Sequence, residues 1–334
     1  MKVLFVNEFE HFGGAEVHIA GLRLALEARG HSTALIAQWA DASRGKPGGD
    51  YLQLTNALEK FQPDVIHFHN VGAKVHDLAW AIGTGFPHVL SLHDYWPWCP
   101  LRNAMMGSHV CQQPCGESCF ASRRGGALAK ELAQAAGPKV VFNPYSAQLN
   151  ALHGIDCQVI PHGVDSVAYQ PASQKSTRAL FISAKARNPA KGEAYYDAVI
   201  GSDIALSLKL IDVPAKDVCF ELGRNLFFLH TGMFEETFCL AIAEAMASGC
   251  CVISFDVAGA RAILGPDRGI LVKRGDVIDM RWQWMEMLHH PERAVALGRA
   301  ARKYIMEHHR PEDMAAAYEG LYSSVLAREE VKVG

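Results

Sequence analysis

The chain has 334 residues, about half of them apolar, so it is long enough for two domains with buried cores. Its 32 Lys and Arg residues nearly balance 35 Asp and Glu residues, which argues against a protein that binds duplex nucleic acid through a basic face. No apolar run is long enough to cross a membrane, so we expect no membrane span.

The first residues and the cysteines indicate the cellular compartment in which we expect the protein. Residues 1–7 form a short apolar run with one Lys, which is typical of a first buried strand rather than a signal peptide. The nine Cys are an odd number, and several fall inside predicted strands or helices, which favours a reducing environment over a disulfide scaffold. We therefore expect a cytoplasmic protein, which could contact the inner face of the membrane peripherally.

In the first half of the chain, continuous β-type runs alternate with stretches of helical spacing. The predicted strands are residues 2–7, 32–37, 64–69, 88–93, 139–142 and 157–161. The predicted helices are residues 14–29 and 54–61, with a further helix between the third and fourth strands. Such alternation predicts βαβ units and a parallel sheet covered on both faces.

A polar segment rich in Ser, Gln and Pro, residues 163–176, predicts an interdomain linker, after which the alternation restarts. Strands are expected at residues 178–183, 204–213 and 250–255, and helices at 192–200 and 238–248. Three final helices begin at about Val277, Pro291 and Pro311. The predicted fold class is α/β, with two Rossmann-like doubly wound domains facing across a cleft. Ligands in such sheets bind at the carboxyl ends of the strands.

One segment, residues 95–124, lacks any clear periodicity and holds four cysteines, which is typical of a functional or tethered loop. The cysteines are Cys99, Cys111, Cys115 and Cys119. Four thiolates this close in sequence could hold a structural Zn ion or an iron–sulfur cluster. Their spacing lacks the two-residue knuckle of common zinc sites, so reduced thiols or a disulfide in a lid remain alternatives.

Two carboxylates mark a predicted helix in the second half of the chain. Glu236 and Glu244 are separated by seven residues, and Thr237 between them could cap the helix. The free N–H groups of the first turn would then form an anion site, with Glu236 just outside it and Glu244 two turns along. From spacing alone, a solvent-facing Glu pair on an Ala-rich helix is the simpler interpretation.

Together with the Ala-Met-Ala-Ser-Gly249 that follows, this segment resembles the signature of retaining glycosyltransferases of family 4, which have the B-type fold (GT-B) of two facing Rossmann-like domains. The resemblance implies that Glu236 lies near the donor sugar and that Glu244 binds the nucleotide ribose. Backbone amides would meet the diphosphate at Thr237, Phe238, Cys239 and Leu240.

Two cations precede this motif, in Ala186-Arg187-Asn-Pro-Ala-Lys191-Gly192. The segment resembles the family's Arg and Lys-Gly pair, although Arg187 is one residue closer to Lys191 than in the family. The resemblance implies that both cations neutralise charge on the departing diphosphate. An ordinary surface charge is the alternative for each.

In the first half, Gly13-Gly14-Ala15-Glu16 follows the first strand and is not the dinucleotide-binding G-x-G-x-x-G. It resembles a family segment whose backbone approaches donor phosphate or acceptor, so Gly13 and Gly14 are candidate donor-binding residues. His93, at a predicted strand end, resembles the family's His that faces the donor sugar, and His69 is the second candidate. A structural role is the alternative for both histidines.

The resemblance predicts a retaining, hexosyltransferase-type glycosyltransferase. It would move a sugar from a nucleoside-diphosphate sugar to a glycan, lipid-linked or small-molecule acceptor. No cofactor is required for catalysis in this scheme, because Lys191, Arg187 and a helix N-terminus take up the diphosphate charge. Two alternatives stay open: a sugar-nucleotide epimerase of the same fold, and a non-catalytic relative that binds sugar nucleotide or partners.

The expected domains are an acceptor-side N-terminal domain (1–165) with the Cys-rich loop, a sugar-nucleotide-binding domain (166–310) and a C-terminal helix (311–334) that packs back on the N-terminal domain. The interval between Asp197 and Glu235 is shorter than the family leads us to expect. We therefore predict a shortened C-terminal domain, with at least one strand–helix unit reduced. His230-Thr-Gly-Met also stands where the family has Pro-Ser.

Overall fold

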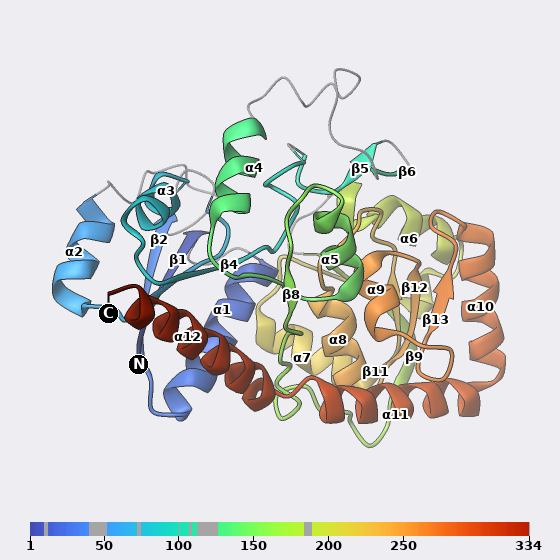
Figure 1. The fold of residues 1–334 in the computed structure, drawn as a ribbon. Coiled ribbons are helices and arrows are strands. Elements are labelled where there is room, and N and C mark those ends of the chain that lie inside the picture. Colours follow the sequence, from blue (N-terminus) through green and yellow to red (C-terminus); the bar gives the residue numbers. More distant parts are fainter. Residues whose placement is uncertain are drawn as a thin grey trace. The chain divides into compact units, whose positions relative to one another are not determined.

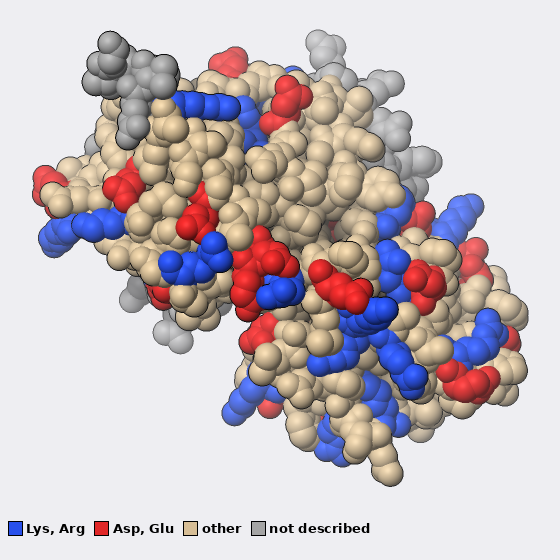
Figure 2. Space-filling view, turned by 60° about the horizontal axis from the view of Figure 1, so that its bottom comes forward, with Lys and Arg blue, Asp and Glu red and all other residues tan. Residues whose placement is uncertain are grey.

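The computed structural model describes residues 1–9, 13–39, 52–71, 75–99, 101–106, 109–111, 126–183 and 189–333. The chain divides into two compact units, Met1–Gly163 with Pro311–Gly334, and Val164–Arg310 (Figure 1). None of the helices in these described ranges is both long and apolar enough to cross a bilayer. Acidic and basic side chains lie next to one another over much of the face drawn in Figure 2, in keeping with the nearly balanced composition.

The first unit is built on a six-stranded sheet in the order β2-β1-β3-β4-β7-β8, with every neighbouring pair parallel. The strands are β1 (Lys2–Phe9), β2 (Ser32–Trp39), β3 (Val65–Phe68), β4 (His88–Ser91), β7 (Lys139–Val141) and β8 (Gln158–Val159). All six predicted strands are confirmed. The chain order reverses between β1 and β3, which is the position where doubly wound sheets bind ligands.

Helices connect these strands, and two of them were not recognised in the sequence. They are α1 (Gly14–Ala28), α2 (Leu52–Phe61), α3 (Val75–Thr84), α4 (Gly126–Ala135) and α5 (Pro144–Ala151). Helix α5 has clear start signals, since the Asn143 side chain accepts from the amide of Ser146 and Pro144 occupies the first turn. Part of the Cys-rich segment forms a short antiparallel pair, β5 (Met105–Met106) and β6 (His109–Val110).

The C-terminal helix α12 (Pro311–Val333) belongs to the first unit, where it packs beside α1 (Figure 1). Two tyrosines attach it to the sheet. The Tyr322 hydroxyl is 2.7 Å from Nδ1 of His67, and the Tyr318 hydroxyl is 3.1 Å from Oγ of Ser91. Buried Tyr hydroxyls need polar partners, so these bonds determine which face of α12 lies against the strands.

The second unit has a five-stranded parallel sheet in the order β10-β9-β11-β12-β13. The strands are β9 (Ser176–Ser183), β10 (Ser207–Ile211), β11 (Asn225–His230), β12 (Cys251–Phe255) and β13 (Ile270–Val272). The helices are α6 (Glu193–Ile200), α7 (Ala215–Arg224), α8 (Leu240–Ala247), α9 (Ala258–Ile263), α10 (Val277–His289) and α11 (Pro291–His308). The starts of α10, α11 and α12 agree with the prediction.

The interval between Asp197 and Glu235 holds β10, α7 and β11, of which α7 and β11 were not identified in the sequence. Strand β11 is buried at all six positions and lies at the centre of the sheet. Its residues, Asn-Leu-Phe-Phe-Leu-His, form a continuous apolar run between polar ends, which is the pattern of a strand covered on both faces. The predicted strand 204–213 begins instead with a 3-10 turn, Ile204–Leu206.

The structure also corrects the start of the carboxylate-bearing helix. Helix α8 begins at Leu240, its N-cap residue is Cys239, and no side chain caps it. The prediction that Thr237 caps this helix is therefore wrong, because the chain has not yet turned into the helix at that residue.

Candidate functional site

The carboxyl ends of β9, β11 and β12 bring together the polar side chains of the second unit. After β11, the chain runs through Thr231 and Glu236 into α8, while Lys191 ends a 3-10 turn, Pro189–Lys191, that follows β9. Gly192 allows these two segments to approach, since it has φ of +74° and a Cβ there would lie 1.8 Å from the carbonyl oxygen of Thr231. The close packing therefore requires glycine at position 192, and it places Lys191 against the segment that carries Glu236.

Glu236 and Lys191 form an ion pair, with Lys191 Nζ 2.6 Å from Oε1 of Glu236. Burial raises the pKa of Glu236, but the Lys191 ammonium and the His230 imidazole outweigh it and hold that pKa well below its ordinary value. Burial lowers the pKa of Lys191, and the nearby carboxylate outweighs this effect and raises it. Both groups are therefore charged at neutral pH, with 34% of the Lys191 side chain still exposed.

His230, at the end of β11, completes this group, although sequence reasoning did not select it. Ser254 Oγ donates to the carbonyl oxygen of Phe255 at 2.8 Å and lies 3.0 Å from Nδ1 of His230. The serine hydroxyl has one proton, so it accepts a hydrogen bond from Nδ1 of His230. His230 Nε2 lies 3.4 Å from Sγ of Cys239 and 3.8 Å from Oε1 of Glu236.

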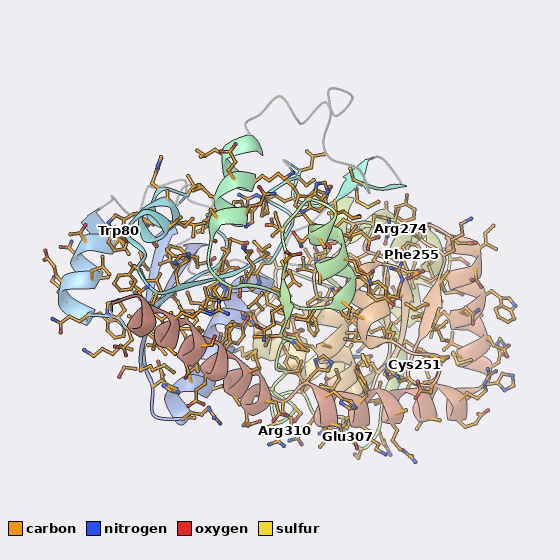
Figure 3. All side chains as sticks on the ribbon, in the orientation of Figure 1. Trp80, Cys251, Phe255, Arg274, Glu307 and Arg310 are labelled. Atoms are coloured by element: carbon orange, nitrogen blue, oxygen red, sulfur yellow. The ribbon has the colours of Figure 1, made fainter. Side chains whose placement is uncertain are left out.

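The neighbouring Glu235 has a structural role. It accepts a hydrogen bond from the amide of Ala258 at 2.6 Å and pairs with Arg274, whose guanidinium also donates to the carbonyl oxygen of Asp256 at 3.3 Å. Figure 3 shows Arg274 beside Phe255, at the opposite end of β12 from Cys251. Glu235 thereby links the segment before α8 to the segment between β12 and α9.

That link lies beside the start of α8, where the diphosphate amides were predicted at Thr237, Phe238, Cys239 and Leu240. A Cβ on Gly259 would come within 2.8 Å of the Phe238 carbonyl oxygen and 3.0 Å of the Cys239 amide nitrogen, so α9 packs closely against this backbone. Burial and then Glu236 raise the pKa of the Cys239 thiol, so it stays protonated and acts as a hydrogen-bond donor.

Glu244 projects from the second turn of α8 and is half-buried. Its carboxyl hydrogen-bonds the Tyr169 hydroxyl, and burial raises the pKa of Glu244 to about 7. The two predicted carboxylates therefore differ in charge state, since Glu236 is held ionised by a cation while Glu244 is poised between its two forms near neutral pH.

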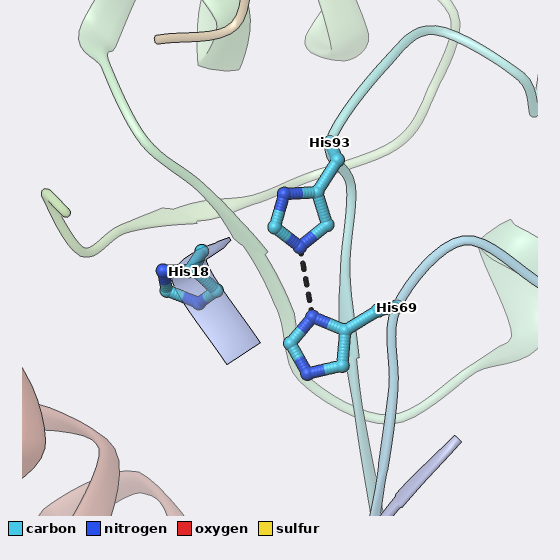
Figure 4. Close-up of side chains that lie close together, drawn as sticks. All are labelled: His18, His69 and His93. Carbon is cyan, nitrogen blue, oxygen red and sulfur yellow. Dashed lines mark hydrogen bonds between the residues drawn. The ribbon is translucent and has the colours of Figure 1, made fainter. Parts of the chain in front are cut away.

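In the first unit, His93 is one of five histidines packed together. His69 Nδ1 is 2.8 Å from His93 Nε2, and His18 Nδ1 bonds to His162 Nδ1. His67 lies against His69, with a ring-centroid separation of 4.0 Å. Figure 4 shows three members, His18, His69 and His93, with their rings turned toward one another. His93 is the only one of the five that is partly exposed.

Burial lowers the pKa of His18 to about 3 and moves the pKa values of His67, His69 and His93 well below their ordinary range, with neighbouring imidazoles adding to the effect. These four rings are therefore neutral at pH 7. The two residues predicted from the sequence, His93 and His69, do come together. His18 was missed, although its position one turn into α1, directly after β1, places it at the same sheet edge.

The Gly13-Gly14-Ala15-Glu16 segment forms the start of α1. Glu16 folds back, accepting from the Gly13 amide and from the Asn7 side chain, each at 2.7 Å. Gly13 has an extended φ of −163°, and among the described atoms a Cβ on it would meet only Glu16 Oε2, at 3.7 Å. Neither backbone strain nor described packing requires glycine at this position.

Three predicted site residues, Arg187, Cys115 and Cys119, lie outside the described residues. Cys99 is buried and Cys111 is half-buried. Within the described ranges, two groups have ligand atoms close enough to share a metal ion, His18 with His69 and His93, and His230 with Glu236 and Cys239. The second group already holds a cation, the Lys191 ammonium, which would repel a metal ion.

Part of the second unit is similar to a known protein family. Residues 212–304, which contain β11, α8 and β12, match the family model "Glycosyl transferases group 1". No curated protein sequence matches the chain significantly.

Solved structures with the same fold include enzymes and complexes with nucleotides. Sucrose-phosphate synthase from Thermosynechococcus elongatus has a TM-score of 0.77 at 14% identity, covering 98% of this chain and 99% of that one. Anabaena Alr3699/HepE with UDP-glucose has a TM-score of 0.73 at 15% identity, covering 97% and 100%. The catalytic domain of starch synthase IV from Arabidopsis thaliana, bound to ADP and acarbose, has a TM-score of 0.70 at 14% identity, covering 98% and 99%.

The predicted fold class is confirmed: the chain has two Rossmann-like domains of the GT-B fold, and part of the second matches the glycosyl transferases group 1 model.

Proposed function

We propose that this protein transfers a sugar from a nucleoside-diphosphate sugar to an acceptor hydroxyl, with retention of anomeric configuration, as a family 4 hexosyltransferase. The observation that carries the proposal is the ion pair of Lys191 and Glu236 beside the start of α8, at the carboxyl ends of the parallel strands. Glu236 and α8 lie within residues 212–304, which match the glycosyl transferases group 1 model, and fold relatives were solved with UDP-glucose or ADP.

The roles assigned to the second unit follow from charge. The bond between the sugar C1 and the diphosphate oxygen breaks as charge gathers on the diphosphate, so a cation there lowers the barrier. Lys191 supplies that cation together with Arg187, and the backbone amides of residues 237–240 take the rest. Glu236 holds Lys191 in place and lies close to the donor sugar, while Glu244 accepts hydrogen bonds from the ribose hydroxyls.

The acceptor hydroxyl oxygen bonds to C1 on the face that the diphosphate leaves, and its proton passes to a departing diphosphate oxygen. This front-side route requires no protein nucleophile and balances without a metal or other cofactor. In the first unit, the partly exposed His93 orients a sugar hydroxyl, and His69, 2.8 Å away, fixes the His93 ring. Gly13 and Gly14 leave room for donor phosphate or acceptor.

A panel of UDP-, GDP- and ADP-sugars tests the proposal. We expect nucleotide release to depend on an added acceptor, with a glycan, a lipid-linked sugar and a small alcohol as the trial acceptors. Proton NMR of the product should show the anomeric configuration of the donor. Product without acceptor would instead identify an epimerase, and nucleotide binding without turnover on any pair would identify a non-catalytic binding protein.

A further inference from the structure

Three histidines of the first unit, two of which also serve the proposed transfer, have a geometry that suits a metal ion. His18, His69 and His93 each present one ring nitrogen, and these three atoms lie within 4.8 Å of one another. His18 is 3% exposed and His69 is fully buried, so both imidazoles are almost completely shielded from water.

Counting ring nitrogens shows what the protein leaves unsatisfied. His67 has partners for both, with Tyr322 Oη at 2.7 Å from Nδ1 and Ser91 Oγ at 2.8 Å from Nε2. His18 uses Nδ1 for His162, and its buried Nε2 has no partner among the residues that the structure describes. His69 Nδ1 and His93 Nε2 share one hydrogen bond, so a single proton now lies between these two nitrogens. A buried polar atom such as His18 Nε2 calls for an explanation, and ligation of a metal ion is one.

We propose that His18, His69 and His93 bind one divalent transition metal ion of the zinc type. Neutral imidazole is a preferred ligand of zinc, copper, nickel and iron, and three histidines with one open position form a known class of zinc site. Zinc–nitrogen distances of about 2.0–2.1 Å place tetrahedral ligand atoms about 3.3 Å apart. The His69–His93 pair, at 2.8 Å, therefore needs to open by only a few tenths of an ångström.

Binding requires one change of tautomer: the proton now shared by His69 Nδ1 and His93 Nε2 moves to the other nitrogen of its ring, by exchange with water at the partly exposed His93. Each neutral ring keeps one proton: His18 binds through Nε2 and donates from Nδ1 to His162, and this hydrogen bond fixes the orientation of the His18 ring. His69 and His93 bind through the two nitrogens that now share one hydrogen bond, and each carries its proton on its other nitrogen. His93, partly exposed, gives the ion a route of entry.

His69 and His93 belong to both proposals, but metal binding does not require the transfer activity, and the transfer scheme includes no metal. The test uses full-length protein stripped with a chelator and then titrated with Zn²⁺ by calorimetry, and with Co²⁺ by absorption. We expect about one ion per chain, with cobalt bands of nitrogen ligation and no thiolate-to-metal charge transfer. His18→Gln and His69→Gln should each lower the affinity by more than about tenfold, while His76→Gln, an exposed histidine on α3, should leave it unchanged.

Far-UV circular dichroism of the metal-free variants checks that they fold, and His93→Gln, at the partly exposed ligand, supplies the same test if a buried variant does not. Zn²⁺ binding that persists in all three variants, or that is abolished by Cys115→Ser, would overturn the proposal, as would the absence of binding by wild-type protein. Acceptor-dependent nucleotide release, measured on the stripped protein, reports on the transfer proposal separately.

Discussion

Each of the two parallel sheets has a cluster of polar side chains at one end, and the buried groups of the two clusters differ in charge state. In the first unit, five imidazoles lie together, and burial lowers the pKa values of four so far that they are neutral. In the second unit, a buried carboxylate stays ionised because Lys191 is 2.6 Å away. A counter-charge, rather than burial alone, decides whether a buried group keeps its charge.

The largest effect is expected from removing that counter-charge. Lys191→Ala takes away a cation that stabilises the leaving diphosphate most in the transition state, so kcat should fall on the order of a hundredfold, about 2.7 kcal/mol, with a smaller change in KM. Stability should also fall, because Glu236 loses its partner. Lys209→Ala is the matched control, since Lys209 pairs with Glu193 and Asp197 on the surface. Equal loss of turnover in both variants would remove Lys191 from the site.

The next effect concerns Glu244. Glu244→Ala should weaken nucleoside-diphosphate binding by about 1.5–3 kcal/mol, the range for hydrogen bonds to a charged acceptor, while the fold survives. Calorimetry on the folded variant gives the number. Unchanged affinity would contradict the ribose assignment.

Glu244 also predicts a pH dependence. Burial raises its pKa to about 7, so ribose hydroxyls meet a proton-bearing carboxyl below that pH and an ionised acceptor above it. Nucleotide affinity should therefore rise from pH 6 to pH 8 more steeply in wild type than in Glu244→Gln. The free protein behaves oppositely: because the folded state holds the proton, its stability falls as pH rises from the ordinary carboxyl range toward 7 and then levels off. Glu244→Gln should lack this component.

His93→Ala tests the neutral cluster. Turnover should fall at least about tenfold, 1.4 kcal/mol in the barrier, while thermal stability stays near wild type, because His93 is the partly exposed member. His76→Ala serves as the control. A variant that melts several degrees early, yet keeps wild-type turnover per folded molecule, would assign His93 a structural role.

The smallest effect is expected at Ser254. Ser254→Ala removes the acceptor of the His230 Nδ1 proton, so the ring of His230 is freer to change tautomer beside Glu236. Loss of one neutral hydrogen bond corresponds to about 0.5–1.5 kcal/mol. We expect turnover to fall severalfold with little change in KM, and Ser254→Thr to restore most of it. A wild-type rate in Ser254→Ala would show that the tautomer of His230 does not matter.

The sequence by itself was enough to predict the alternation of strands and helices, the two-domain class and the position of the Glu236 motif. These depend on local periodicity and on residues adjacent in the chain, such as the apolar run of β1 or the Pro that begins α11. Strand β11 was not predicted even so, because all its residues are buried and its sequence shows no alternation of apolar and polar side chains.

Tertiary structure decided what those residues meet. The His18–His162 bond joins positions 144 residues apart, and Tyr322 reaches His67 across 255 residues, so no spacing in the chain announces the histidine cluster. The ion pair of Lys191 with Glu236 depends on the fold, which brings these two residues together. Thr237 does not cap α8, because the helix begins three residues later. The charge states also depend on the tertiary structure. Glu236 and Glu244 are the same type of residue, and their pKa values differ because burial raises that of Glu244 while a neighbouring ammonium group lowers that of Glu236.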